Sequence, residues 1–214
     1  VFRGRQSLEI VMGLFCLKML YPDRIFLLRG NHEFMHANSR YGFPLEIKER
    51  YTDDDTVTTL YAHVNLSFCY LSVAAIVGNI YFCAHAGISS AGCTRRLIRR
   101  VPKPYLYSQI DFTLHDMMWS DPVNGLRASI FFGVEVMAYA MYNMECIGIF
   151  RGHSMMTKGY DVIGGICISL FSCVGQTNNK GSVAHIDANG GVMIKVFEID
   201  QARVAWDAEL LRFD

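Results

Sequence analysis

The hydrophobic pattern at the start of the chain predicts a helix followed by a strand. In residues 7–20, SLEIVMGLFCLKML, apolar side chains recur every three or four positions, as they do on one face of a helix. Ser7 is a suitable N-cap for this helix, and Pro22 ends it. The expected buried face consists of Leu8, Val11, Met12, Phe15 and Met19. The apolar run RIFLL at 24–28 predicts a short buried strand, so helix and strand form half of a βαβ unit whose first strand would lie before Val1.

Shorter apolar runs predict the remaining elements. The segments LSVAAIV and IYFCAH flank Gly78 and Asn79, a two-residue turn that predicts a β-hairpin. Residues 44–68 and 134–144 have a mostly helical pattern, and the strand IGIF follows the second of these segments. Strands dominate after Gly165, in the segments ICISLFSC, SVAHID and VMIKVFEI. No repeat, low-complexity tract or proline-rich linker interrupts the chain, which predicts a single α/β domain.

Composition and charge exclude several classes of function. The 20 acidic and 20 basic residues give a net charge of zero, so neither nucleic acid nor an anionic membrane surface is an expected partner. The basic run TRRLIRRV at 94–101 predicts a short helix whose arginines form a solvated face. No apolar run approaches the roughly 20 residues that a membrane span requires. The seven cysteines contain no CxxC pair, which is typical of reduced thiols in an intracellular protein, cytoplasmic or nuclear.

Three polar clusters follow directly after predicted buried strands. They are RGNHE at 29–33, HAG at 85–87 and RGHS at 151–154. Each contains a histidine next to a small residue, which lets the backbone approach a ligand or a metal. The carboxyl ends of strands are where α/β proteins assemble sites from distant segments. A single such histidine is more often a satisfied core residue, but three clusters favour a site. An asparagine oxygen and two imidazoles suit Mn, Fe or Zn better than Ca.

These clusters belong to a longer series of motifs. LLRGNHE, YGF, AAIV, YFCAHAGIS, WSDP, RGHS and LFS occur in the order and approximate spacing found in the phosphoprotein phosphatases, and the chain resembles this family of metal-dependent serine/threonine protein phosphatases, of type 1 or 2A. The resemblance implies a calcineurin-like metallophosphoesterase fold, α/β with a central β-sandwich flanked by helices and without the first βα segment. VFRGRQSLE resembles the family's GDxVDRG motif entered halfway, so we expect residues 1–214 to form one phosphatase-like domain that is incomplete at its N-terminus.

The resemblance also implies which residues carry the chemistry. The family uses two divalent metals, Mn, Fe or Zn, to polarise a phosphate and to activate water. The ligands of one metal match Asn31, His85 and His153. His32 matches the general acid that protonates the leaving serine or threonine oxygen, and Glu33 is expected to orient its neighbours. The arginines expected to bind the substrate phosphate are Arg3, Arg29 and Arg127. Because the family's GDxHG motif and the first Asp of GDxVDRG are absent, we expect at most one partial metal site in this chain.

The chain also departs from the family's pattern at positions within its own length. Phe2 replaces the second Asp of GDxVDRG, which pairs with the catalytic histidine in the family, and we expect this change to cost roughly 10²–10⁴ in rate. Leu126 stands where the family has an arginine, so that Arg127 comes one position late. Cys173 takes the place of a tyrosine in a shortened loop, and Ala86 replaces a glycine. Together these differences are typical of a decaying or repurposed site.

Two functions of different classes are therefore open. The first is a protein serine/threonine phosphatase that hydrolyses phosphoserine and phosphothreonine by metal-activated water, with phosphoprotein substrates and regulatory subunits as partners. The second is a pseudophosphatase, a binding or scaffold protein without turnover. A metallophosphoesterase of small molecules is a third alternative, against which LLRGNHE and WSDP favour the protein phosphatases.

Overall fold

The computed structural model of the protein describes residues 6–90, 92–123 and 131–199. Among these residues the strands form one five-stranded sheet and two separate strand pairs. The five-stranded sheet has the order β1–β2–β5–β7–β6, with bounds Ala74–Val77, Tyr81–Ala84, Gly148–Arg151, Cys167–Leu170 and Tyr160–Ile163. Its three central strands are parallel, whereas β1 and β6 are antiparallel to their neighbours. The strand pairs are β3–β4 (Asp121–Pro122 and Phe131–Phe132) and β8–β9 (Gly181–Ile186 and Val192–Phe197).

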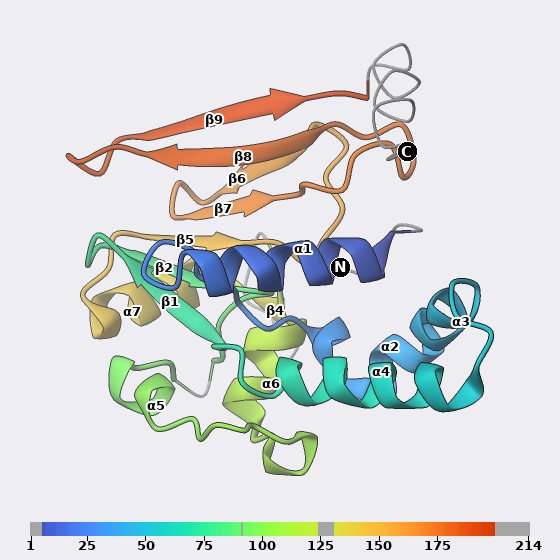
Figure 1. Ribbon diagram of the computed structural model, residues 1–214. Coiled ribbons are helices and arrows are strands. Elements are labelled where there is room, and N and C mark those ends of the chain that lie inside the picture. The colour runs from blue at the N-terminus through green and yellow to red at the C-terminus, as the bar shows by residue number, and fades with distance from the viewer. Residues whose placement is uncertain (1–5, 91, 124–130, 200–214) are drawn as a thin grey trace.

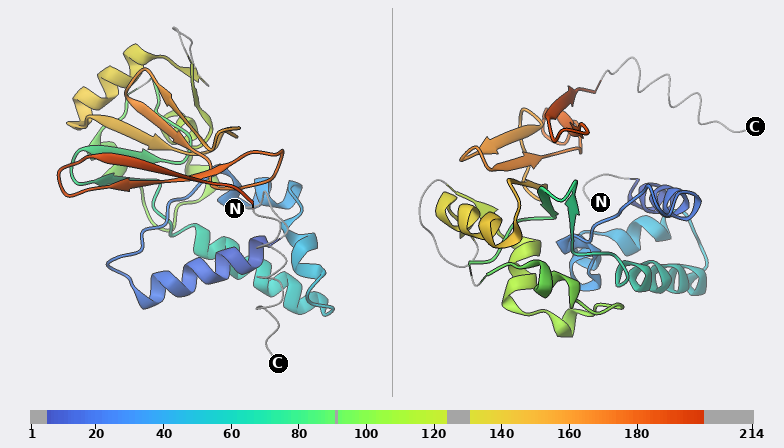
Figure 2. Two further views of the ribbon diagram at one scale, coloured as in Figure 1. Left: turned by 90° about the horizontal axis from the view of Figure 1, so that it is seen from above. Right: turned by 90° about the vertical axis from the view of Figure 1, so that its left-hand side faces the viewer.

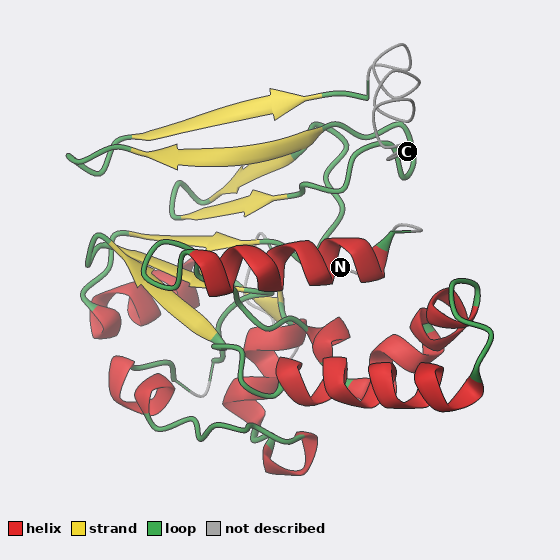
Figure 3. Ribbon diagram, viewed as in Figure 1, coloured by secondary structure: helices red, strands yellow, loops and turns green. Residues whose placement is uncertain are grey.

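Helices cover the five-stranded sheet on both sides (Figures 1, 2 and 3). The α-helices are α1 (Ser7–Leu20), α2 (Met35–Arg40), α3 (Phe43–Lys48), α4 (Asp54–Phe68), α5 (Arg95–Arg99), α6 (Phe112–Trp119) and α7 (Val134–Met144). Short 3₁₀ turns occupy Asn31–Glu33 and Tyr107–Gln109. Helix α7 lies on one side of the sheet, and α1 lies on the opposite side (Figure 2). Side chains cap the first turns of α4, α5 and α6, from Asp53, Thr94 and Asp111 respectively.

Two clusters of buried side chains hold these layers together. The sheet core lies between the sheet and helices α6 and α7, and its fully buried members include Phe82, Met117, Met137 and Ile149. The helical core joins α1 to α3 and α4 through Leu8, Val11, Phe43, Ile47, Val64 and Phe68. Phe34 belongs to the sheet core, so the 3₁₀ turn that precedes it is anchored there.

Most of the predicted elements are confirmed. The helix expected over 134–144 is α7, and the strands expected after Gly165 include β7, β8 and β9. The hairpin around Gly78 and Asn79 is formed by β1 and β2, and both turn residues have the positive φ angles that such a turn requires. Because Val77 pairs with Tyr81, the connection has three residues rather than two. The α/β class is confirmed, as a sheet flanked by helices.

The face that α1 buries differs from the prediction. Leu8 and Val11 are buried, but Met12 and Met19 are exposed, by 42% and 73%. Helix α1 carries apolar residues around its whole circumference, so its periodicity does not identify one face, and the contacts with α3 and α4 decide instead. The N-cap prediction was also wrong, because Ser7 is the first helical residue and follows Gln6.

The strand predicted over 24–28 is largely absent. Within residues 24–28, all of which are described, Leu28 alone makes a β-bridge, to Ser72, and Phe26 is 72% exposed. A strand is defined by its hydrogen-bonded partner, and no described strand runs beside this extended segment. The strand prediction was therefore wrong for most of this segment, and Arg24 lies in a turn.

The sheet topology brings three chain segments to one edge. Strands β2, β5 and β7 are neighbours and parallel, so their carboxyl ends, which lead into His85, Gly152 and Phe171, lie side by side. This edge is where the predicted histidines are expected to meet. In the described part of the chain, no helix has the length and apolar character to cross a membrane.

We predict that the thiols fall into two reactivity classes. Burial raises the pKa of Cys83 and Cys167 to about 11 and that of Cys93 to about 12, whereas Cys16 is exposed on α1. Because the thiolate is the reactive form, iodoacetamide at pH 8 should alkylate Cys16 first in the native protein. The three buried cysteines should be alkylated only after unfolding. Peptide mass spectrometry of timed samples measures this order, with Cys16→Ser as the control. Alkylation of Cys93 at the rate of Cys16 would contradict the packing described above.

Candidate functional site

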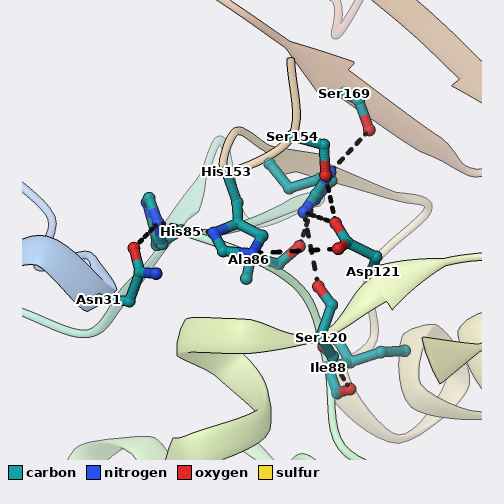
Figure 4. Close-up of polar contacts among 10 residues, drawn as sticks. Asn31, His85, Ala86, Ile88, Ser120, Asp121, His153, Ser154 and Ser169 are labelled. Atoms are coloured by element: carbon teal, nitrogen blue, oxygen red, sulfur yellow. Dashed lines mark hydrogen bonds and ion pairs between the residues drawn. The ribbon is translucent and has the colours of Figure 1, made fainter. Parts of the chain in front are cut away.

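Three polar side chains from distant segments converge at the edge of the sheet. Asn31 Oδ1 lies 2.8 Å from His85 Nε2, and His85 Nε2 lies 3.3 Å from His153 Nδ1 (Figure 4). The two imidazole rings meet edge to face, with their centroids 5.2 Å apart. The predicted meeting of Asn31, His85 and His153 is therefore observed, and each directs an oxygen or nitrogen atom to the same small region.

The backbone explains why these residues meet. His85 follows the last residue of β2, and His153 follows the end of β5 by two residues. The amide of Gly152 donates a hydrogen bond to the carbonyl of His85, at 2.9 Å, and so ties the two strand ends together. His153 has a positive φ of 65°, a conformation that non-glycine residues seldom adopt. The loop therefore turns sharply at the residue that points back toward His85.

Gly30 allows the Asn31 turn to approach His85. A Cβ at this position would lie 2.6 Å from His85 Nδ1 and 2.7 Å from Glu33 Oε2, distances at which something must shift. The same Glu33 oxygen accepts a hydrogen bond from the Gly30 amide at 2.8 Å. Glu33 thus closes the turn that presents Asn31, and so orients this neighbour as predicted.

The electrostatics of the site favour neutral imidazole. Burial, followed by the proximity of His153 and then of Arg151, lowers the pKa of His85 well below its ordinary value. A neutral imidazole keeps a lone pair on one ring nitrogen, which a proton or a metal can take. The His85 side chain is thus held in the form that binds a cation.

Arg151 connects the loops that carry the site. Its guanidinium donates to Asp121 Oδ1 at 2.6 Å, to Ser154 Oγ at 2.9 Å and to the carbonyl of Ala86. Ser154 also donates to the same Asp121 oxygen (Figure 4). Burial lowers the pKa of Arg151, and the negative charge of Asp121 opposes that shift. One buried cation therefore joins the loop after β2, the loop after β5 and strand β3.

Asp121 also faces the far nitrogen of His153. Its Oδ2 lies 3.9 Å from His153 Nε2, on the opposite side of the ring from the nitrogen that faces His85. The separation is longer than a hydrogen bond, so Asp121 places a negative charge near this nitrogen without a direct bond to it. Sequence reasoning did not assign this role to Asp121, although the WSDP motif that contains it was noted.

Asn31, His85 and His153 line a cavity of about 620 Å³, and His32 lines the same cavity. His32 is buried, and its ring lies 4.2 Å from the ring of Tyr41, centroid to centroid. Cys173, from the shortened loop, also lines the cavity. Among the described residues that line it, Glu33 is the only acid, and no arginine or lysine is present. The described part of the cavity is thus rich in imidazole and amide groups and poor in charge.

Of the three predicted phosphate-binding arginines, only Arg29 lies among the described residues, and it does not line this cavity. Arg29 is 2% exposed, and its guanidinium donates to the carbonyls of Glu33 and Tyr105 and lies 3.8 Å from the centroid of the Phe34 ring. Its donors therefore hold the turn against the core rather than facing the cavity. Arg3 and Arg127 lie outside the described residues, as does Phe2.

The distances between the three donor atoms match those expected between ligands of one metal. Ligands that lie about 2.0–2.1 Å from one metal stand about 2.8–3.4 Å apart, from adjacent octahedral to tetrahedral positions. The observed separations of 2.8 and 3.3 Å fall in this range, and nitrogen and oxygen donors suit Mn, Fe or Zn. No three His, Cys, Asp or Glu side chains converge among the residues with described positions, so the set consists of one amide and two imidazoles. These residues fit one divalent metal, and the described part of the chain adds no anionic ligand to them.

Comparison with known proteins identifies the family and the fold. The family model of the calcineurin-like phosphoesterases matches residues 2–156. The structure is similar to that of a protein serine/threonine phosphatase from Saccharomyces cerevisiae with similarity to human phosphatase PP5. The TM-score is 0.78 and the sequence identity is 26%, and the match covers 92% of this chain and 67% of that chain. The predicted calcineurin-like fold is thus confirmed.

We predict that Gly30→Ala damages the site while a matched change elsewhere does not. The added methyl group would push on His85 and Glu33, and overpacking of this kind costs about 1–3 kcal/mol of unfolding free energy. Displacing a ligand should also weaken Mn²⁺ binding by about 10–100-fold. Gly13→Ala is the control, because Gly13 is an exposed position of α1 where a Cβ meets nothing within 4 Å. This change should stabilise the helix by about 1 kcal/mol.

Urea unfolding and calorimetric Mn²⁺ titration measure the two effects. If Gly30→Ala and Gly13→Ala unfold at the same urea concentration and bind Mn²⁺ equally well, the close approach of the turn to His85 is wrong.

Proposed function

The chain belongs to the calcineurin-like phosphoesterase family, and on that premise we propose that it acts as a phosphatase on phosphoserine and phosphothreonine side chains of proteins. One observation carries this proposal: Asn31 Oδ1, His85 Nε2 and His153 Nδ1 converge in a cavity that also contains His32. The likeness to a protein serine/threonine phosphatase supports the protein-directed branch over small-molecule phosphoesterases. Phosphoproteins are the corresponding substrates, and regulatory subunits are expected partners.

Asn31, His85 and His153 would hold a divalent metal in this proposal. A metal bound there would polarise a phosphate oxygen and lower the pKa of a bound water. The protein's part is to keep His85 neutral through burial and to place the negative charge of Asp121 near His153. Arg151 holds both loops in place, so the donors are positioned before a substrate arrives.

His32 would supply the proton to the leaving oxygen. It lines the cavity beside the three donors, and the ring of Tyr41 packs against it and restricts its orientation. A serine or threonine alkoxide is a poor leaving group, so protonation by a positioned imidazolium contributes typically about 10²–10⁴ in rate. The phosphate itself would be bound by Arg3 and Arg127, while Arg29 supports the turn from behind.

A second candidate is binding of phosphoproteins without turnover. A specific observation favours it: the only acid among the described lining residues is Glu33, and its Oε2 accepts a hydrogen bond from the Gly30 amide. A metal held by three neutral donors has no anionic ligand to offset its charge and is bound weakly. Phe2, in place of the family's second Asp, also leaves His32 without that carboxylate.

We predict that His32→Gln separates the two candidates. The protein with Mn²⁺ is mixed with a fluorescent phosphothreonine peptide, and phosphate release and binding anisotropy are both measured. For a phosphatase, His32→Gln should lower kcat by about 10²–10⁴ and leave peptide binding within about twofold, because the proton is needed only in the transition state. His63→Gln, an exposed histidine on α4, is the matched control and should change neither value.

Peptide binding with the same background phosphate release in all three proteins would establish the second candidate instead. Absence of phosphopeptide binding in the unaltered protein would contradict both.

A further inference from the structure

A second cavity lies away from the site described above. It has a volume of about 460 Å³ and lies between α5, the loop that follows it and the first turn of α6. It shares no lining residue with the site cavity. Leu114, on α6, lines it, and Trp119, at the other end of the same helix, lies 6.0 Å from the ring of His153. At about 1.5 Å per residue, the two positions are about 7–8 Å apart along the helix.

The rim of this cavity is positively charged. Arg96 and Arg100 line it, and Arg99 is exposed on the same helix. None of the three forms a salt bridge within the described part of the chain. Arg95 differs, because it donates to the Met144 carbonyl at 2.6 Å and is committed to the fold. The guanidinium groups of Arg96 and Arg100 are therefore available to a carboxylate from outside.

The single acid at the cavity is already engaged. Asp111 Oδ1 accepts a hydrogen bond from the Leu114 amide at 2.9 Å and caps α6. Asp111 therefore caps the helix, and its one negative charge does not balance the two positive charges of Arg96 and Arg100 at the cavity. An acidic ligand would meet two arginines and one capping carboxylate, so the balance of charge favours it.

The floor of the cavity is apolar. Leu97, Val101 and Leu114 supply apolar surface. Tyr105 also lines the cavity, is 1% exposed, and its hydroxyl has no hydrogen-bond partner among the described residues. Burial and then the charge of Asp111 raise the pKa of Tyr105. Because the hydroxyl oxygen is itself closed off from solvent, Tyr105 contributes mainly its apolar part to the cavity.

We propose that this cavity docks an acidic peptide segment of a partner protein. An apolar side chain of the peptide would rest on Leu97, Val101 and Leu114, and flanking carboxylates would pair with Arg96 and Arg100. The cavity volume of about 460 Å³ falls in the range of ligand sites. The sequence predicted only a solvated basic face here, whereas the cavity also offers an apolar surface on which an anchor side chain can rest. This inference goes beyond the proposed function, because none of its residues takes part in the site chemistry.

The test uses the whole chain and a fluorescein-labelled peptide, GDELEELDEG. Binding is measured by fluorescence anisotropy at low salt, for the unaltered protein and for Arg96→Glu/Arg100→Glu. Removing both arginines should raise Kd by about tenfold or more, because two ion pairs are replaced by repulsion. Arg24→Glu/Lys195→Glu is the matched control, with the same change of net charge at two exposed positions, and should change Kd by about twofold at most.

A second peptide tests whether the cavity itself is occupied. GDESEESDEG keeps the charges and lacks the leucines, and it should bind about tenfold more weakly or worse because its anchor is gone. Methyl NMR signals of Leu97 and Leu114 should shift with the first peptide. Equal binding of both peptides, equal loss in the control variant, or displacement of the peptide by inorganic phosphate would each overturn the proposal.

Discussion

The buried guanidinium of Arg151 is the contact on which the geometry of the site depends. A charge that is removed from water must be paired and hydrogen-bonded, and Asp121, Ser154 and the carbonyl of Ala86 satisfy this one. Because these partners come from β3 and from the loops after β2 and β5, satisfying one cation fixes three segments relative to one another. The positions of His85 and His153 follow from that constraint.

The site combines rigid donors with low charge. Parallel strands deliver the histidines to one edge, and Gly30 allows the Asn31 turn to come within hydrogen-bond distance of His85. Burial keeps His85 neutral, and Glu33 is the only acid among the described residues that line the cavity. A neutral set of donors does not offset the charge of a cation, so binding energy at this site would come from lone-pair donation alone.

Helix α6 connects this site with the second cavity. Its first turn carries Leu114 in the cavity wall, and its last residues lead to Trp119 beside His153 and to Asp121 behind it. The backbone carbonyl of Tyr105 also accepts a hydrogen bond from Arg29, which supports the Asn31 turn. The two regions therefore share rigid supporting elements without sharing lining residues.

The sequence alone determined the features that depend on neighbouring residues. The apolar period identified α7, the Gly78–Asn79 turn identified the β1–β2 hairpin, and the polar clusters RGNHE, HAG and RGHS identified Asn31, His85 and His153 as residues that meet. Helical period, turn conformation and strand ends are local properties, and the family's motifs are read in the same way.

The tertiary structure decided what depends on contacts between distant residues. It set the buried face of α1, left residues 24–28 with a single bridge, and turned Arg29 into the core rather than toward the cavity. It also placed Asp121 behind His153 and built a cavity beside the arginines of α5. The physical reason is that a side chain's type limits the contacts it can make, whereas packing chooses among them, and packing is fixed by segments that lie far apart in the chain.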